Sequence, residues 1–211
     1  MSNVKKMLGV DHLIGICGIA GSGKTTAAMH ICQQLPYWRY SFAGPLKDAV
    51  ADLFMLDRER LNEEHYKNAP NDTWGLTPRK IMQLFGTEAM RGTFGKDFWL
   101  IQAEERIKLL AAKAVANKLC VVIDDVRFQN EIDFIKWYGG KILYIYRPDL
   151  EVARADSRVV VHASEQIIIP NNLDPQEALV CNAFGDKDKF QADVMRIARR
   201  WHYENDDLMY R

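Results

Sequence analysis

The sequence has no excess of charge of either sign, no paired cysteines and no long apolar run. Lysine plus arginine and aspartate plus glutamate number 28 each, so the chain has no long-range attraction for polyanions or acidic lipid. A nucleic-acid-binding protein is therefore disfavoured. The four cysteines are widely spaced and include no CxxC pair, which argues against a zinc knuckle or a redox dithiol. We expect them to be small core residues of a protein in a reducing compartment.

No stretch approaches the roughly 18 apolar residues of a membrane span, and the first residues lack the apolar run of a signal peptide. The sequence therefore predicts a cytoplasmic protein with no membrane partner. A chain of 211 residues with an apolar share of 48% can bury one sizeable core, which predicts a single α/β domain with insertions.

Short apolar runs alternate with longer segments of helical periodicity, which is typical of a parallel sheet covered by helices on both faces. Thr77 and Pro78 should begin a helix, and Gly139-Gly140 should end one. The expected fold is three-layer α/β. The expected strands are 13–17, 40–42, 119–123, 141–146 and 178–181, and the expected helices are 24–35, 45–56, 78–90, 98–117, 130–138 and 189–201.

The strongest motif is a complete GxxxxGK[ST] pattern from Gly18 to Thr25, between an expected strand and an expected helix. Glycines let backbone N–H groups wrap around phosphates, Lys24 adds a positive charge, and the Thr25 hydroxyl can join the shell of Mg²⁺. A chance glycine-rich turn is the weaker interpretation because both flanking elements are present. We expect ATP as co-substrate, Mg²⁺ as cofactor and Lys24 as a catalytic residue. The expected ATP-binding residues of the loop are Gly21, Ser22, Gly23, Lys24, Thr25 and Thr26.

Two acids, Asp124 and Asp125, end the expected strand 119–123, at the sheet edge that the phosphate loop should share. One of them can hold the water shell of the metal, and a solvated turn is the alternative. We assign this metal role, together with Thr25, to Asp125, on the resemblance described below.

Cationic and polar residues gather in three segments between elements, 42–48, 79–99 and 125–131, where a parallel sheet places its ligands. In the second segment, Arg79, Gln83 and Gly86-Thr87 recur at about one helical turn and lead to Arg91, so one face could bind a phosphate monoester. Spacing alone slightly favours an ordinary exposed helix face. Trp99 would more often be a core residue than a base-stacking one.

A further polar segment follows the expected strand 141–146 and contains Arg147, Arg154, Arg158 and His162. Arginines here could close over the transferred phosphoryl group and exclude water, as a lid does. We assign Arg154 and Arg158 as catalytic and 147–166 as the lid. A solvated surface helix is the alternative.

These segments, in this order, resemble the bacteriophage deoxynucleoside monophosphate kinases, which are relatives of the adenylate and dephospho-coenzyme A kinases. The resemblance runs from Ile14 to about Arg199 and implies a P-loop NTPase fold with an acceptor-binding insertion at 43–99. It also implies that Asn182 precedes the adenine-side turn, although this turn is one residue longer here than in the family. The acceptor-binding residues implied are Lys47, Arg79, Gln83, Gly86, Thr87, Arg91, Trp99, Asp125, Arg127 and Glu131.

The resemblance implies transfer of the γ-phosphoryl group of ATP to a deoxynucleoside monophosphate by a monomer or homodimer, in the host cytoplasm if the chain is viral. Its partners would be small nucleotides. No catalytic base is needed, because an acceptor phosphate carries nucleophilic oxygens at neutral pH. The alternatives are a P-loop kinase for another small acceptor, such as dephospho-coenzyme A, and a nucleotide-dependent switch ATPase.

Overall fold

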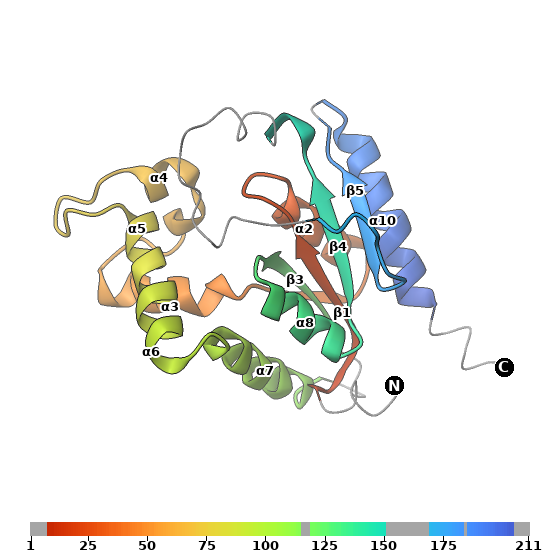
Figure 1. Cartoon of the computed structure of the whole chain (residues 1–211), viewed down its shortest axis with the longest axis horizontal. Coiled ribbons are helices and arrows are strands. Elements are labelled where there is room, and N and C mark those ends of the chain that lie inside the picture. Colours follow the sequence, from red (N-terminus) through yellow and green to blue (C-terminus); the bar gives the residue numbers. More distant parts are fainter. Residues whose placement is uncertain (1–7, 115–118, 151–168, 184, 205–211) are drawn as a thin grey trace. The chain divides into compact units, whose positions relative to one another are not determined.

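The computed structural model describes residues 8–114, 119–150, 169–183 and 185–204. The chain divides into two compact units (Figure 1). We call residues 1–40 with 106–211 the sheet unit, and residues 41–105 the helical unit. The helical unit spans nearly the same residues as the insertion expected at 43–99.

The sheet unit is built on five parallel strands, β1 to β5, in the order β2-β3-β1-β4-β5. A phosphate loop follows the central strand, as the predicted P-loop NTPase fold requires. The prediction of β2 at 40–42 was wrong, because all four residues of the observed strand pair with β3 and the chain then turns into the next helix. The strands are β1 (Val10–Cys17), β2 (Tyr37–Tyr40), β3 (Leu119–Val126), β4 (Lys141–Tyr146) and β5 (Glu177–Cys181).

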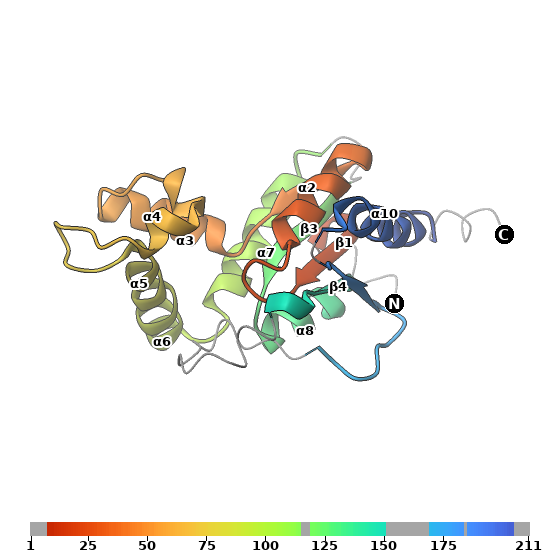
Figure 2. The same ribbon diagram turned by 90° about the horizontal axis from the view of Figure 1, so that it is seen from above.

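Helices cover both faces of this sheet, which confirms the predicted three layers (Figure 2). On one face, Ile14 of β1 shares a buried core with Ile31 of α2 (Lys24–Gln34) and Val194 of α10 (Lys187–Tyr203). On the other face lies α8 (Gln129–Trp137), so close that a Cβ at Gly15 would lie 2.5 Å from Ile135 Cδ1. Alternate residues of β1 therefore face different helices.

The helical unit has its own small apolar core, which contains Val50, Leu61 and Ile81. Thr77 caps its expected helix, since the Thr77 hydroxyl accepts a hydrogen bond from Lys80 N at 3.2 Å. The elements are α3 (Ala43–Leu53), η1 (Arg60–Asn62), α4 (Glu64–Asn68), α5 (Pro78–Gln83), η2 (Leu84–Arg91), α6 (Gly92–Phe94) and the first part of α7 (Phe98–Ala111).

The helix expected at 78–90 is not one continuous α-helix. It widens into a π-helical segment, η2, after Gln83. Within this segment the Gly86 carbonyl accepts a hydrogen bond from Trp99 Nε1 at 2.9 Å. Such widened turns occur often at functional sites.

The remaining predictions differ from the structure mainly at element ends. Gly139 has a left-handed φ of 70°, and Gly140 N donates to Ile135 O, so the predicted glycine stop after α8 is confirmed. Helix α7 ends at Ala111, earlier than the expected 117. Within the part of the chain that the structure describes, no helix is both long and apolar enough to cross a membrane.

Candidate active site

The phosphate loop connects β1 to α2, and its glycines are required by geometry. Gly21 and Gly23 have φ values of 79° and 105°, in the left-handed region that favours glycine. A Cβ at Gly18 would lie 2.6 Å from Ser22 Oγ and 2.7 Å from the Ile145 carbonyl oxygen. The loop is therefore tightly wound, and it leads directly into the amino end of α2, where backbone N–H groups favour an anion.

Lys24 begins α2 and is only 8% exposed. Its ammonium donates hydrogen bonds to the carbonyls of Gly18 and Ile19, at 2.6 and 2.7 Å. Burial, followed by the positive charge of Arg127, lowers the Lys24 pKa to about 8, against the opposing effect of Asp125. A bound polyanion would favour the charged form again.

Two side chains at the ends of neighbouring strands contact the same loop. Asn182, just after β5, donates from Nδ2 to the Ser22 carbonyl at 2.7 Å, and its backbone N donates to Tyr146 O. Arg147, just after β4, donates from Nη1 to the Gly21 carbonyl at 3.2 Å. The structure thus brings Asn182 to the loop, while its predicted contact with ATP stays a prediction.

Asp124 reaches the amino end of α2. Its side chain is 3% exposed, accepts a hydrogen bond from Thr25, and forms an ion pair with Arg39 of β2 at 2.8 Å. Burial, then the charge of Asp125, raises the Asp124 pKa above its ordinary value, and Arg39 and Thr25 act in the opposite direction. The metal role that we assigned to Asp125 stays a prediction, and the contact with Thr25 makes Asp124 a second candidate for it.

Alternation along β3 explains why Asp124 meets α2. Cys120 and Val122 face α2 and α10, so Asp124, two residues further, lies on the same side, where Thr25 of α2 contacts it. Arg39 was missed altogether. Its position could have been predicted from strand alternation, because Arg39 lies two residues after Tyr37 on β2, on the face that Tyr37 shares with the α2 core.

Oxygen ligands of the kind that Mg²⁺ prefers meet at this position. The Thr25 hydroxyl and the buried Asp124 carboxylate contact each other, and Asp125 is adjacent in the chain. This set of donors fits a magnesium ion beside a bound triphosphate.

Glu131, predicted to bind the acceptor, has a structural role in the described contacts. It is 4% exposed, and its Oε2 accepts hydrogen bonds from the backbone N of Arg127 and Phe128, at 2.7 and 3.0 Å. The carboxylate therefore fixes the turn between β3 and α8, from which the half-buried Arg127 extends. A glutamate at the third helical position is the signal that sequence reasoning could have used.

Within the helical unit, two of the predicted acceptor residues contact polar residues of η1 and α4. Arg79 hydrogen-bonds Asn68 at 2.8 Å and pairs with Glu64, and Lys47 Nζ donates to Asn62 Oδ1 at 2.9 Å. The half-buried residues Gln83, Thr87 and Arg91 lie along α5 and η2. Their role in acceptor binding stays a prediction.

Trp99 and Gly86 are packed in the interior of this unit. Trp99 is 9% exposed, and a Cβ at Gly86 would lie 2.8 Å from Leu46 Cδ2. Together with the indole hydrogen bond to Gly86, this burial favours the core interpretation of Trp99. The predicted catalytic arginines Arg154 and Arg158 lie outside the described residues.

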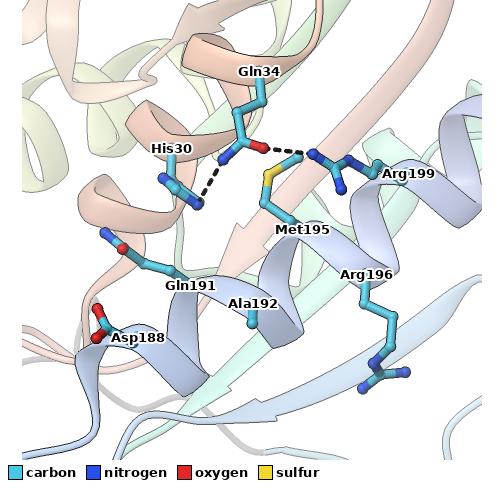
Figure 3. Close-up of a pocket in the computed structure, with 8 residues that line it drawn as sticks. All are labelled: His30, Gln34, Asp188, Gln191, Ala192, Met195, Arg196 and Arg199. Carbon is cyan, nitrogen blue, oxygen red and sulfur yellow. Dashed lines mark hydrogen bonds between the residues drawn. The ribbon is translucent and has the colours of Figure 1, made fainter.

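An open hollow of about 500 Å³ lies between α2 and α10 (Figure 3). Its polar side chains already contact one another, with Gln34 bonded to His30 at 2.9 Å and to Arg199 at 2.6 Å. None of the residues that line it belongs to the phosphate loop. We therefore do not assign it to the nucleotide.

Comparison with known proteins identifies the family of the chain. The family model for deoxynucleotide monophosphate kinase matches residues 55–175. A protein of Acanthamoeba polyphaga mimivirus named "Putative deoxynucleotide monophosphate kinase" is 38% identical over 184 residues, which cover 78% of this chain and 91% of that protein. The chain belongs to the deoxynucleotide monophosphate kinase family. This membership confirms the resemblance stated from the sequence and makes the protein a nucleotide kinase.

Two solved structures align with most of the chain at 14% identity. A sugar kinase from Janibacter sp. HTCC2649 has a TM-score of 0.42, covering 90% of this chain and 93% of its own. A dephospho-CoA kinase from Campylobacter jejuni has a TM-score of 0.47, covering 92% and 98%. At these scores neither likeness carries an argument, and the strand order and the loop define the fold.

Proposed function

We propose that this family member transfers the γ-phosphoryl group of ATP to a deoxynucleoside 5′-monophosphate, giving the diphosphate and ADP. One observation carries the proposal. The tightly wound loop beside Lys24, with Thr25 bonded to the buried Asp124, offers N–H donors, a cation and hard oxygen ligands to a triphosphate.

In this reaction an oxygen of the acceptor monophosphate attacks the γ-phosphorus, and the bond from that phosphorus to the β–γ bridging oxygen breaks. ADP leaves with the electron pair. No general base is required, since the attacking oxygen is already anionic at neutral pH. The loop N–H groups and Lys24 hold the phosphates and stabilise the charge that develops on the leaving group.

Thr25 and Asp124 would hold Mg²⁺, with Asp125 nearby. When bound, Mg²⁺ neutralises part of the phosphate charge. Asp124 suits this role because Arg39 and Thr25 hold its carboxylate in one position, and a carboxylate fixed in advance loses little freedom on binding.

For the acceptor, we propose Arg127 as a phosphate ligand, held in place through the hydrogen bonds of Glu131 to its turn. We also propose that the other acceptor residues implied by the family bind the monophosphate, and that Arg154 and Arg158 are catalytic. The proposal also includes small nucleotides as partners, with no nucleic-acid or membrane partner, a monomer or homodimer, and a cytoplasmic location.

A panel of acceptors tests the function. ADP release from Mg-ATP would be measured with each of the four deoxynucleoside monophosphates, the matching ribonucleotides, dephospho-coenzyme A, and no acceptor. We expect turnover with at least one deoxynucleoside monophosphate and little without an acceptor. Turnover that is independent of any acceptor would instead indicate a switch ATPase, and a response only to dephospho-coenzyme A would overturn the proposed substrate. Lys24→Ala protein, prepared in parallel, controls for contaminating kinases.

A further inference from the structure

Three neighbouring strands place metal-binding side chains in one row at the amino ends of the strands. In the sheet register His12 of β1 lies beside Cys120 of β3, and Cys120 lies beside Tyr37 of β2. Side chains paired in this way point to the same face of the sheet. Here that face is covered by α10, whose last turn carries His202.

The side chains of this row lie close together and are largely buried. The ring centroids of His12 and His202 are 4.8 Å apart, and those of Tyr37 and His202 are 5.6 Å apart. The ligand atoms of His12, Cys120 and His202 all lie within 4.8 Å of one another. His12 is 9% exposed and Cys120 is 5% exposed.

Among the residues that the structure describes, no hydrogen-bond partner is found for two buried polar atoms in the cluster. They are Nδ1 of His202 and the hydroxyl oxygen of Tyr37. A buried polar atom without a partner is unfavourable by about 1–3 kcal/mol, and such atoms often indicate an ion or water that completes the site. Tyr37 is 6% exposed, so bulk water does not satisfy its hydroxyl.

We infer that His12, Cys120 and His202 form a binding site for one Zn²⁺ ion, at the end of the sheet opposite the phosphate loop. Two imidazole nitrogens and a thiolate are ligands that Zn²⁺ prefers. With Zn–N near 2.0–2.1 Å and Zn–S near 2.3 Å, tetrahedral ligand atoms lie about 3.3–3.7 Å apart. The ligand atoms, which lie within 4.8 Å of one another, therefore need to approach by at most about 1–1.5 Å, which small rotations of the two histidine side chains would supply.

Binding of Zn²⁺ exchanges a thiol proton and bound waters for bonds to the protein. The Cys120 thiol loses its proton to solvent, one Zn–S and two Zn–N bonds form, and the ion releases the waters that these ligands replace. The fourth position keeps a water molecule, beside the Tyr37 hydroxyl. Because its ligands come from β1, β3 and α10, the bound ion joins the sheet to the helix that covers it.

The site is separate from the proposed chemistry. His12 precedes Gly18 by six positions along β1 and the start of the loop, which corresponds to about 20 Å of extended chain. The inference therefore does not depend on the proposed function. No short sequence motif indicates the site, since His12, Cys120 and His202 are far apart along the chain.

Metal binding to the full-length protein tests the inference. Protein stripped with a chelator would be titrated with Co²⁺ in excess Mg²⁺, which occupies hard oxygen sites, and then with Zn²⁺. We expect one ion per chain, with the d–d and thiolate-to-metal bands of four-coordinate Co²⁺, and displacement by Zn²⁺. Zn²⁺ at about 100 times its dissociation constant should raise the melting temperature by about 5–10 °C.

Variants locate the ion. Cys120→Ser and His202→Ala should each lose the bands and the Zn²⁺-dependent melting shift, whereas Cys181→Ser, which alters an exposed cysteine, should keep both. Each variant is compared with its own metal-free form, so a change in basal stability does not affect the result. If Cys120→Ser does not fold, His202→Ala at the half-buried end of α10 still decides. Absence of stoichiometric binding in the parent protein, or full binding in His202→Ala, would overturn the inference.

Discussion

Replacing each of two adjacent acids by its amide tests whether Asp124 or Asp125 serves the metal. Asp124→Asn removes the charge of the carboxylate that contacts Thr25 and Arg39, while it keeps the shape of the side chain. Asp125→Asn is the matched control, because it makes the same chemical change one residue further along β3. The sequence analysis assigned the metal role to Asp125, so comparing the two variants also tests that prediction against the proposal for Asp124.

The size of the effect follows from the surroundings of Asp124. Losing one fixed group that stabilises transition-state charge lowers turnover by about 100- to 1000-fold, or about 2.7–4 kcal/mol. Stability should change little. The Arg39 side chain is 42% exposed, so water solvates its charge once its partner is neutral. A neutral amide also avoids the unfavourable free energy of burying a charged carboxylate, the effect that raises the Asp124 pKa. We expect a melting temperature within about 3 °C of the parent.

The assay is initial-rate ADP release at saturating monophosphate, with ATP and Mg²⁺ varied, alongside thermal melting. Asp124→Asn should lower kcat/KM for Mg-ATP by about 100-fold or more and raise the Mg²⁺ concentration required. Asp125→Asn should lose less than about tenfold. A folded Asp124→Asn enzyme with near-parental activity, or a larger loss in Asp125→Asn, would refute the assignment.

Three further predictions concern the cations of the sheet unit. Lys24→Ala should lower kcat at least about 100-fold with an unchanged melting profile, and unaltered turnover would contradict its role. The Lys24 pKa of about 8 lies below its ordinary value, so about half of the free enzyme lacks this charge at pH 8, and ATP should restore it. Calorimetry in two buffers of different ionisation enthalpy should therefore detect uptake of about half a proton per ATP bound at pH 8. ATP binding should become weaker at higher pH, and Lys24→Arg protein should show no such proton uptake. Arg127→Ala should mainly raise the KM for the monophosphate, measured against a fixed saturating ATP concentration, and a change confined to the KM for ATP would contradict the proposed acceptor contact.

The central sheet and the phosphate loop could be predicted because their signals are local. The strand 141–146 matches β4 at both ends, since a run of apolar residues between a glycine pair and Arg147 has only one simple interpretation. Strand β2 was displaced because Trp38 and Arg39 are exposed on the sheet edge, so the segment lacks the apolar run of a buried strand. Edge strands carry a weaker pattern than central ones.

Other features could not be predicted from the sequence because they depend on tertiary contacts. The π-helical turn of η2 coincides with a hydrogen bond from Trp99 to Gly86, which no spacing rule contains. Glu131 has a residue type that suits a ligand site, but its carboxylate accepts hydrogen bonds from the backbone of its own turn. The contact of Asp124 with Thr25 is different, because alternation from Cys120 and Val122 already places Asp124 on the α2 side of β3.

The same alternation relates the two ends of one sheet face and limits how strongly they can interact. Cys120 and Asp124 lie on one side of β3, four positions or about 13 Å apart, with the buried Val122 between them. A Zn²⁺ ion bound to one thiolate adds a net single positive charge, which at 13 Å and an effective dielectric constant of about 20 amounts to about 1.3 kcal/mol. That energy lowers the Asp124 pKa by about one unit at most. Because Asp124 would act as a carboxylate, a shift in this direction preserves its active form, and occupancy of the distant site should change the melting temperature far more than the turnover.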